Sequence, residues 1–136
     1  MAYRVSAITG VRIDVSQKEL LARRLGVPIE EVKNYKGPIA GPESPRPMCM
    51  WNIHKQYEDA VFLDDIVSEQ IQIARDIRDR IGLPPPQGIS SYMSLYVGGS
   101  LAESDERFCG GSFTRQMLRD LAELIDDFDI DLNIYP

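Results

Sequence analysis

Hydrophobic and polar residues alternate along four short segments of the chain, which is the pattern of strands that bury one face. The alternation covers residues 3–9, 48–55, 90–97 and 130–135. In the second segment, the period of two places Trp51 on the same face as Cys49 and Ile53. We expect the large ring of Trp51 to anchor the core. The pattern therefore predicts a small sheet of four strands.

Apolar residues at three- and four-residue spacings predict three helices between these strands. Their expected ranges are 16–25, 59–81 and 114–128. Ser16 and Glu19 form a capping-box pattern at the start of the first helix, and Gly26 follows its last turn. Thr114 is a suitable N-cap for the third helix. The helix boundaries are therefore marked in the sequence itself.

The elements follow one another in the order βα–β–α–βαβ within a single domain, residues 1–136. This order predicts an α+β fold, a two-layer α/β sandwich with helices on one face of a four-stranded, mostly antiparallel sheet. Residues 36–47 contain four prolines and two glycines, so we expect a loop there. A loop of this length is either functional or a surface excursion.

The bulk composition narrows the functional classes. The net charge is −6 and the isoelectric point is near 4.7, which argues against nucleic acid or an anionic membrane as partner, because both require a basic surface. No apolar run approaches the roughly 20 residues of a membrane helix, and the N-terminus lacks the apolar stretch of a signal peptide. We therefore expect a cytoplasmic protein.

The candidate catalytic residues are few. His54 is the single histidine. The two cysteines, Cys49 and Cys109, are expected to be free thiols in a reducing compartment, and a disulfide that joins two strand ends is the alternative. Cys49 and His54 are separated by an odd number of positions, which points them to opposite faces of one strand. Cys109 is followed by two glycines before the third helix, where a helix N-terminus would activate a thiol, although a flexible turn explains the pattern as well.

Metal or cofactor chemistry receives little support. The sequence contains no CxxC, HExxH or calcium-loop motif. Asp129 and Asp131 share one face of the last strand and could contribute to a hard-cation site only if further oxygen ligands converged. Solvent-facing charges that discourage aggregation are the simpler explanation, so we expect no cofactor.

The acidic C-terminal stretch FDIDLNIYP raises the main question about function. Its alternation predicts that Ile130, Leu132 and Ile134 close the core against Trp51 and the last helix. The polar residues of the strand then face the other way, which leaves an acidic surface suited to a partner protein.

Part of the chain resembles a bacterial family known only as a domain of unknown function. The similarity rests on SLYVGGSLAESDERFCGGSFTRQMLRDLAELIDDFDIDLNIY, in which a strand, a glycine-bearing loop and a Leu- and Ala-rich helix precede an acidic strand. LGVPIEEVKNYKG and the tryptophan strand MWNI are similar more loosely. The resemblance implies no established activity. Small acidic α/β domains of this kind occur as immunity proteins beside bacterial toxins.

The sequence therefore favours a non-enzymatic protein-binding domain, with an immunity protein that neutralises a cognate basic toxin as the leading hypothesis. The alternatives are a small enzyme that depends on a thiol or histidine, and a homo-oligomeric structural module. The expected partner-binding residues are acidic or aromatic: Asp126, Asp127, Asp129, Asp131, Glu103, Asp105, Glu106, Tyr96 and Tyr135.

Overall fold

The computed structural model of the chain describes residues 3–35, 47–58, 62–100 and 111–135. The strands are β1 (Tyr3–Asp14), β2 (Lys33–Tyr35), β3 (Met48–Glu58), β4 (Ser90–Ser100) and β5 (Asp127–Tyr135). The helices are α1 (Lys18–Leu25), α2 (Leu63–Ile81) and α3 (Arg115–Leu124), and the single turns η1 (Val15–Gln17) and η2 (Ile29–Glu31) are 3-10 helices.

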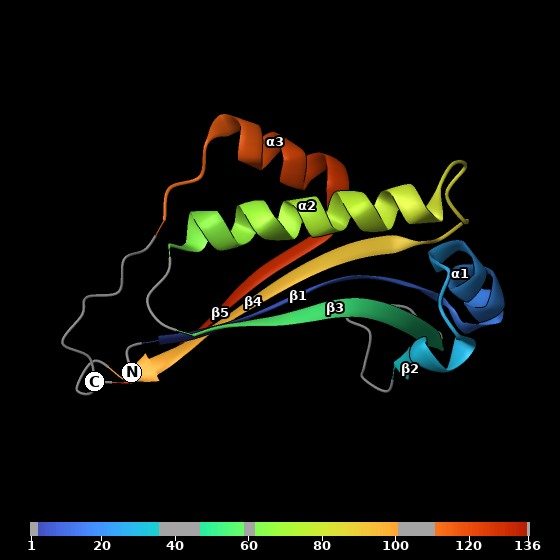
Figure 1. The fold of residues 1–136 in the computed structure, drawn as a ribbon, viewed down its shortest axis with the longest axis horizontal. Helices are drawn as coiled ribbons and strands as arrows, with labels where there is room; N and C mark the ends of the chain where they lie inside the picture. Colours follow the sequence, from blue (N-terminus) through green and yellow to red (C-terminus); the bar gives the residue numbers. More distant parts are fainter. Residues whose placement is uncertain (1–2, 36–46, 59–61, 101–110, 136) are drawn as a thin grey trace.

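The five strands of the described residues form one mixed sheet in the order β2-β3-β1-β4-β5 (Figure 1). β1 is central and antiparallel to both β3 and β4, and β2 is antiparallel to β3. β5 runs parallel to β4, because α3 carries the chain back before the last strand begins. The prediction of a four-stranded, mostly antiparallel sheet is therefore wrong: the described residues form five strands, and the sheet is mixed because β5 joins β4 in parallel.

The helices lie on one side of this sheet, and the fold is α+β (Figure 1). α2 runs along the sheet, α3 lies on α2, and α1 sits at the end where β1 finishes. Residues of β1 alternate accordingly: Val5, Ala7, Val11 and Ile13 are buried beneath the helices, whereas Arg4 is exposed on the opposite side. We call the side opposite α2 and α3 the open face of the sheet.

The core divides into two clusters along α2. The first cluster joins β1 and β4 to the first half of α2 and to α3; its buried members are Val5, Ala7, Leu63, Ile66, Val67, Ile71, Ala74, Met93, Leu95, Val97, Leu121 and Ile125. The second cluster joins β1 and β3 to α1 and the end of α2; its buried members are Val11, Ile13, Leu21, Ala22, Leu25, Val32, Cys49, Ile77 and Ile81. Each end of the sheet therefore has its own apolar support.

Two of the predicted helix boundaries are confirmed. Gly26 ends α1 in the left-handed conformation with φ 71°, which glycine adopts without strain. The Thr114 hydroxyl accepts a hydrogen bond from the backbone N–H of Met117 at 3.1 Å, as an N-cap does. The predicted capping box of Ser16 is wrong: α1 begins after Gln17, whose side chain makes no cap hydrogen bond. Ser16 lies in the preceding turn η1, where its backbone N–H donates to the Asp14 carboxylate at 2.9 Å.

The last strand lies at a different place from the one predicted. β5 is an edge strand, and β1 and β4 separate it from β3, so Ile130 and Leu132 cannot pack against Trp51. Ile130 and Leu132 face the helix side but are 38% and 59% exposed. Trp51 is half-buried and packs against the second cluster instead. The alternation of the strand is correctly predicted, but its role in closing the core is not.

Candidate functional site

β5 presents two rows of side chains, one on each face. Asp127, Asp129 and Asp131 pair with Tyr92, Ser94 and Tyr96 of β4 on the open face; we call these three aspartates the acidic row. Phe128, Ile130 and Leu132 lie on the helix side and form the apolar row. All six side chains are exposed. The edge strand is therefore accessible on both of its faces.

Asp126 has a structural task at the start of β5. Its carboxylate accepts the backbone N–H of Ser91 at 2.7 Å, and its own N–H donates to the Ser91 carbonyl at 2.9 Å. These two bonds tie the chain to β4 one residue before the ladder begins. Of the four aspartates predicted to contact a partner, Asp126 is thus the one whose carboxylate is committed to the backbone.

Arg12 of β1 partly neutralises the acidic row. Its guanidinium forms an ion pair with Asp127, donates to the Ser90 hydroxyl at 3.2 Å, and lies 5.4 Å from the centroid of the Tyr92 ring. These contacts hold Arg12 against the sheet beside the first carboxylate of the row. The negative charge of the row is therefore concentrated toward Asp129 and Asp131.

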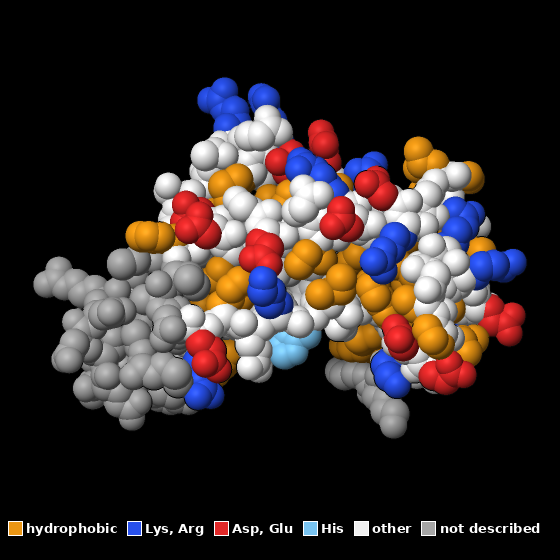
Figure 2. All heavy atoms as spheres, in the orientation of Figure 1, with side chains coloured by type: hydrophobic (Ala, Val, Ile, Leu, Met, Phe, Trp, Pro, Cys, Tyr) orange, Lys and Arg blue, Asp and Glu red, His pale blue; other side chains and the backbone are white. Residues whose placement is uncertain are grey.

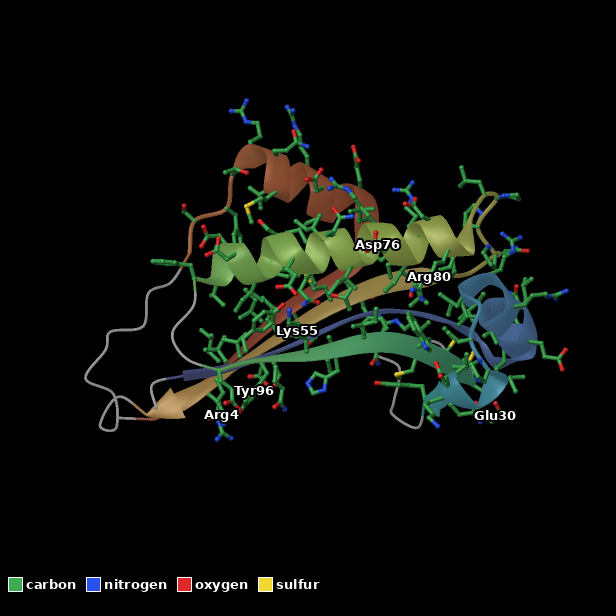
Figure 3. All side chains as sticks on the ribbon, viewed as in Figure 1. Arg4, Glu30, Lys55, Asp76, Arg80 and Tyr96 are labelled. Carbon is green, nitrogen blue, oxygen red and sulfur yellow. The ribbon has the colours of Figure 1, made fainter. Side chains whose placement is uncertain are left out.

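The other open-face residues beside β5 are polar and hydrogen-bonded. The Ser94 hydroxyl donates to the carboxylate of Asp129, and Asn133 donates to the Tyr96 hydroxyl at 2.9 Å. Tyr96 is 40% exposed and projects from the open face together with Arg4 (Figure 3). Its ring lies over Gly98, where a Cβ atom would approach the ring to 2.9 Å. Tyr96 thus has the exposure of an aromatic anchor in a partner interface.

A hydrogen bond crosses the central strand over Gly10. Gly10 pairs with Asn52 on one side and with Tyr92 on the other, and the Asn52 amide donates to the Tyr92 hydroxyl at 2.9 Å. A Cβ atom at position 10 would lie 2.3 Å from the Trp51 carbonyl oxygen. Burial raises the pKa of Tyr92, against the opposing effects of the Asn52 hydrogen bond and the Arg12 charge. Only glycine leaves room for this crossing.

The helix side of the sheet carries a buried polar chain. The Thr9 hydroxyl donates to the Gln70 side-chain oxygen at 2.7 Å, and the Gln70 amide donates to the Tyr57 hydroxyl at 3.0 Å. Lys55 forms an ion pair with Glu69 between the sheet and α2 (Figure 3). Their hydrogen bond raises the pKa of Lys55 and lowers that of Glu69. These groups satisfy one another and fix α2 on the sheet.

Several predicted site residues cannot be placed. Glu103, Asp105, Glu106 and Cys109 lie outside the described residues, and so does the side chain of Tyr135. The residues that the structure brings together are therefore the acidic row and Tyr96. Arg12, Ser94, Asn133 and Gly10 adjoin them and were missed, because only pairing between distant strands reveals them.

The thiol that is described does not have the surroundings of a nucleophile. Cys49 is fully buried in the second cluster, and this burial raises the pKa of its thiol. His54 is exposed on the open face, on the other side of the same strand, as its spacing predicts. Within the described ranges, histidine, cysteine and carboxylate side chains form no group of three that could hold a metal ion.

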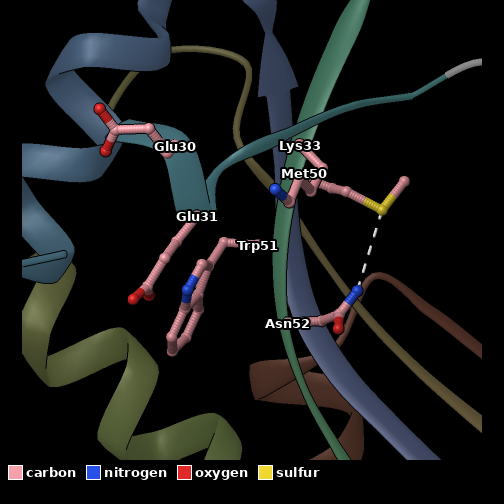
Figure 4. Close-up of a pocket in the computed structure, with 6 residues that line it drawn as sticks. All are labelled: Glu30, Glu31, Lys33, Met50, Trp51 and Asn52. Atoms are coloured by element: carbon pink, nitrogen blue, oxygen red, sulfur yellow. Dashed lines mark hydrogen bonds between the residues drawn. The ribbon is translucent and has the colours of Figure 1, made fainter. Parts of the chain in front are cut away.

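One depression lies at the opposite end of the sheet from β5. It is open, with a volume of about 510 Å³, and Trp51 and Glu31 lie side by side in it (Figure 4). Its lining residues are Glu30, Glu31, Lys33, Met50, Trp51 and Asn52. A smaller depression of about 210 Å³ lies between β1, β3 and Tyr96. Figure 2 shows acidic and basic side chains intermixed over the helices, so this visible side has no uniform charge.

Comparisons with known proteins do not assign the chain to a family. No protein-family model, curated protein or solved structure matches the chain. Among the described helices, none combines the length and apolar character that a membrane crossing needs. The functional argument therefore rests on the surfaces of this chain.

Proposed function

We propose that the protein is a non-enzymatic binding domain whose partner is a basic protein, with cytoplasmic immunity against a cognate bacterial toxin as its biological role. The observation that carries this proposal is the acidic row, three exposed carboxylates on the open face of an edge strand. The net charge of −6 points in the same direction. Charges of this kind accelerate the encounter with an oppositely charged partner and orient it.

The surface around the acidic row has the composition of a protein interface. Tyr96 supplies an exposed aromatic ring, and the smaller depression beside it is lined by both charged and apolar residues. Tyr96 is held through its hydroxyl by Asn133, so little side-chain entropy is lost when it contacts a partner. The acidic row would orient the partner, and the Tyr96 region would contribute affinity.

An immunity role predicts a partner encoded beside the gene. The test is affinity purification from the native host, followed by co-expression with the product of the neighbouring gene. We expect a stoichiometric complex with a basic protein whose toxicity is suppressed. A neighbouring product that neither binds the purified chain nor is toxic would contradict the immunity role.

The site assignment is tested on that complex. Replacing Asp129 and Asp131 together by asparagine should weaken binding about tenfold and reduce its dependence on salt concentration, because two exposed charges are removed. The matched control replaces Glu30 and Glu31 by glutamine, which removes the same charge near the β2 edge. Equal effects of the two double variants would show that net charge, and not this strand, matters.

A thiol enzyme remains the alternative and is tested separately. In a Cys109→Ser variant, the remaining Cys49 should react with an alkylating reagent only as fast as the protein unfolds, since its side chain is fully buried. Rapid modification of Cys49 at neutral pH in the folded variant would restore the enzyme hypothesis.

A further inference from the structure

We propose that the outer edge of β5 binds an extended segment of the partner as an added strand of the sheet. The segment carries basic residues at alternate positions, which face the acidic row, and apolar residues between them, which face the apolar row. This inference rests on the proposed function and specifies the chemistry of its partner.

The backbone of β5 is the first support. β5 is the last strand in the sheet order and pairs with β4 along all nine of its residues. Among the described residues no strand pairs with its other side. Backbone N–H and C=O groups on that side are directed outward, and an extended peptide can bind them as a further strand.

The apolar row is the second support. On β4, the neighbouring helix-side residues Met93, Leu95 and Val97 are at most 1% exposed. One strand further, the exposed fractions are 38% for Phe128 and 59% for Leu132. The cover provided by the helices therefore ends between β4 and β5. Apolar side chains from an added strand would extend the first core cluster outward and remove the row from water.

The acidic row decides which strand is accepted. Arg12 neutralises Asp127, whereas the Asp129 carboxylate accepts a hydrogen bond from the neutral hydroxyl of Ser94 and forms no ion pair with the described residues. Asp131 forms no ion pair within the described part of the chain. A lysine or arginine opposite Asp129 or Asp131 would gain a cross-strand ion pair, whereas an acidic residue there would be repelled.

The same row disfavours a second copy of this chain. Two β5 strands that pair antiparallel about a two-fold axis keep their open faces on the same side. Pairing centred on Ile130 would place Asp129 opposite Asp131 twice, and pairing centred on Asp129 would place two Asp129 side chains opposite each other. Like charges directly across a ladder destabilise it, so self-association through this edge is opposed by the side chains that attract a basic strand.

The test uses synthetic peptides as probes. The first is a capped nine-residue peptide in which lysine and valine alternate; the second has the same composition with the lysines grouped at one end. Titration calorimetry should show that the alternating peptide binds at least about tenfold more tightly. Amide exchange by NMR should show new protection in residues 127–135 only with the alternating peptide.

Three variants connect this binding to the edge. Binding of the alternating peptide should weaken several-fold in the double variant Asp129→Asn/Asp131→Asn, which alters the open face of β5. It should also weaken several-fold in the variant Leu132→Ser, which alters the helix side. Glu30→Gln combined with Glu31→Gln should leave it unchanged. A peptide that is N-methylated on the amides of one side should lose its binding, since an added strand needs those donors. Circular dichroism verifies that every variant is folded.

The outcomes separate the two proposals. Strand addition would be overturned if the alternating and grouped peptides bound with equal affinity, or if N-methylation of either side of the peptide left binding unchanged. Either result would leave the proposed binding function intact, because that function is tested on the complex with the partner protein. A dimer in light scattering with protected β5 amides and no peptide would also overturn it. Peptide binding at β5 without any complex with the neighbouring gene's product would support strand addition and contradict the immunity role.

Discussion

The two edges of the sheet meet the same physical problem in different ways. One edge is β2, a strand of three residues in which Lys33 and Asn34 are exposed. The other is β5, a strand of nine residues with three aspartates on one face. An unpaired strand edge invites association, and shortness, lysine and like charges each discourage it. β2 offers little backbone to pair with, whereas β5 offers a long edge restricted by charge.

The two edges also differ in how they are supported. Beside β2, Val32 is 1% exposed and belongs to the second cluster with α1. Beside β5, Ile125 is 9% exposed and belongs to the first cluster, but the strand that follows it is exposed on both faces. β2 is thus attached next to a buried cluster, and β5 is held mainly by its ladder to β4. β5, the longer of the two edge strands, is therefore the one that remains available to pair with a further strand.

The largest expected effect on stability comes from a substitution in β1, the central strand of the sheet. Gly10→Ala should lower the free energy of unfolding by about 4 kcal/mol, above the usual range for an overpacked site, because the new Cβ meets the backbone carbonyl oxygen of Trp51 in a paired strand. Chemical denaturation measures the loss. Both edges should lose amide protection together, and a loss confined to one edge would show that the sheet does not unfold as a unit.

The next largest effect separates the edges. Ile125→Ala should cost about 3 kcal/mol and Val32→Ala about 2 kcal/mol, because each opens a cavity in a different cluster. Native-state amide exchange should accelerate in β5 for the first variant and in β2 for the second. If either variant accelerated both edges equally, the separate support of the two strands would be disproved.

A smaller effect tests the start of β5. Asp126→Ala should lower stability by about 1 kcal/mol, because the backbone N–H of Ser91 loses its carboxylate acceptor. The control is Asp131→Ala on the same strand, where no ion pair within the described residues is lost and little change is expected. Thermal denaturation compares the two, and an equal effect would contradict the anchoring role of Asp126.

The smallest effect is a dependence on alkaline pH. Burial raises the pKa of Tyr92 and of Tyr57 above the ordinary value of about 10. The folded state therefore retains tyrosine protons that the unfolded state loses, so the tyrosine contribution to stability is constant below about pH 10 and falls as the pH rises through the folded pKa values. Denaturation at several pH values measures this decline. Tyr92→Phe should make it shallower, and an unchanged slope would refute the contribution of Tyr92.

Much of the fold follows from local sequence patterns. The faces of β3 and β5, the glycine end of α1 and the Thr114 cap depend on residues near one another in the chain, and each was predicted from them. β2 was missed because three residues are too few to show alternation. The position of β5 was predicted wrongly and its direction was left open, because both depend on how α3 packs, which no local pattern records.

The candidate site was predicted only in part for the same reason. The acidic row is visible in the sequence because Asp127, Asp129 and Asp131 alternate with apolar residues. The ion pair that neutralises one of them joins residues 115 positions apart. Gly10 carries no local signal either, since its importance comes from Asn52 and Tyr92 on two other strands.

The position of Trp51 gives the molecule a spectroscopic reporter for one edge alone. It is the single tryptophan, and it lies half-buried on β3 beside the depression near β2. β5 is three strand spacings away, about 14 Å at the usual separation. Intrinsic emission should follow the opening of the β2 side and remain constant when a non-fluorescent ligand occupies β5. A fluorescence titration can therefore report occupancy of the β2 end selectively, without any added label.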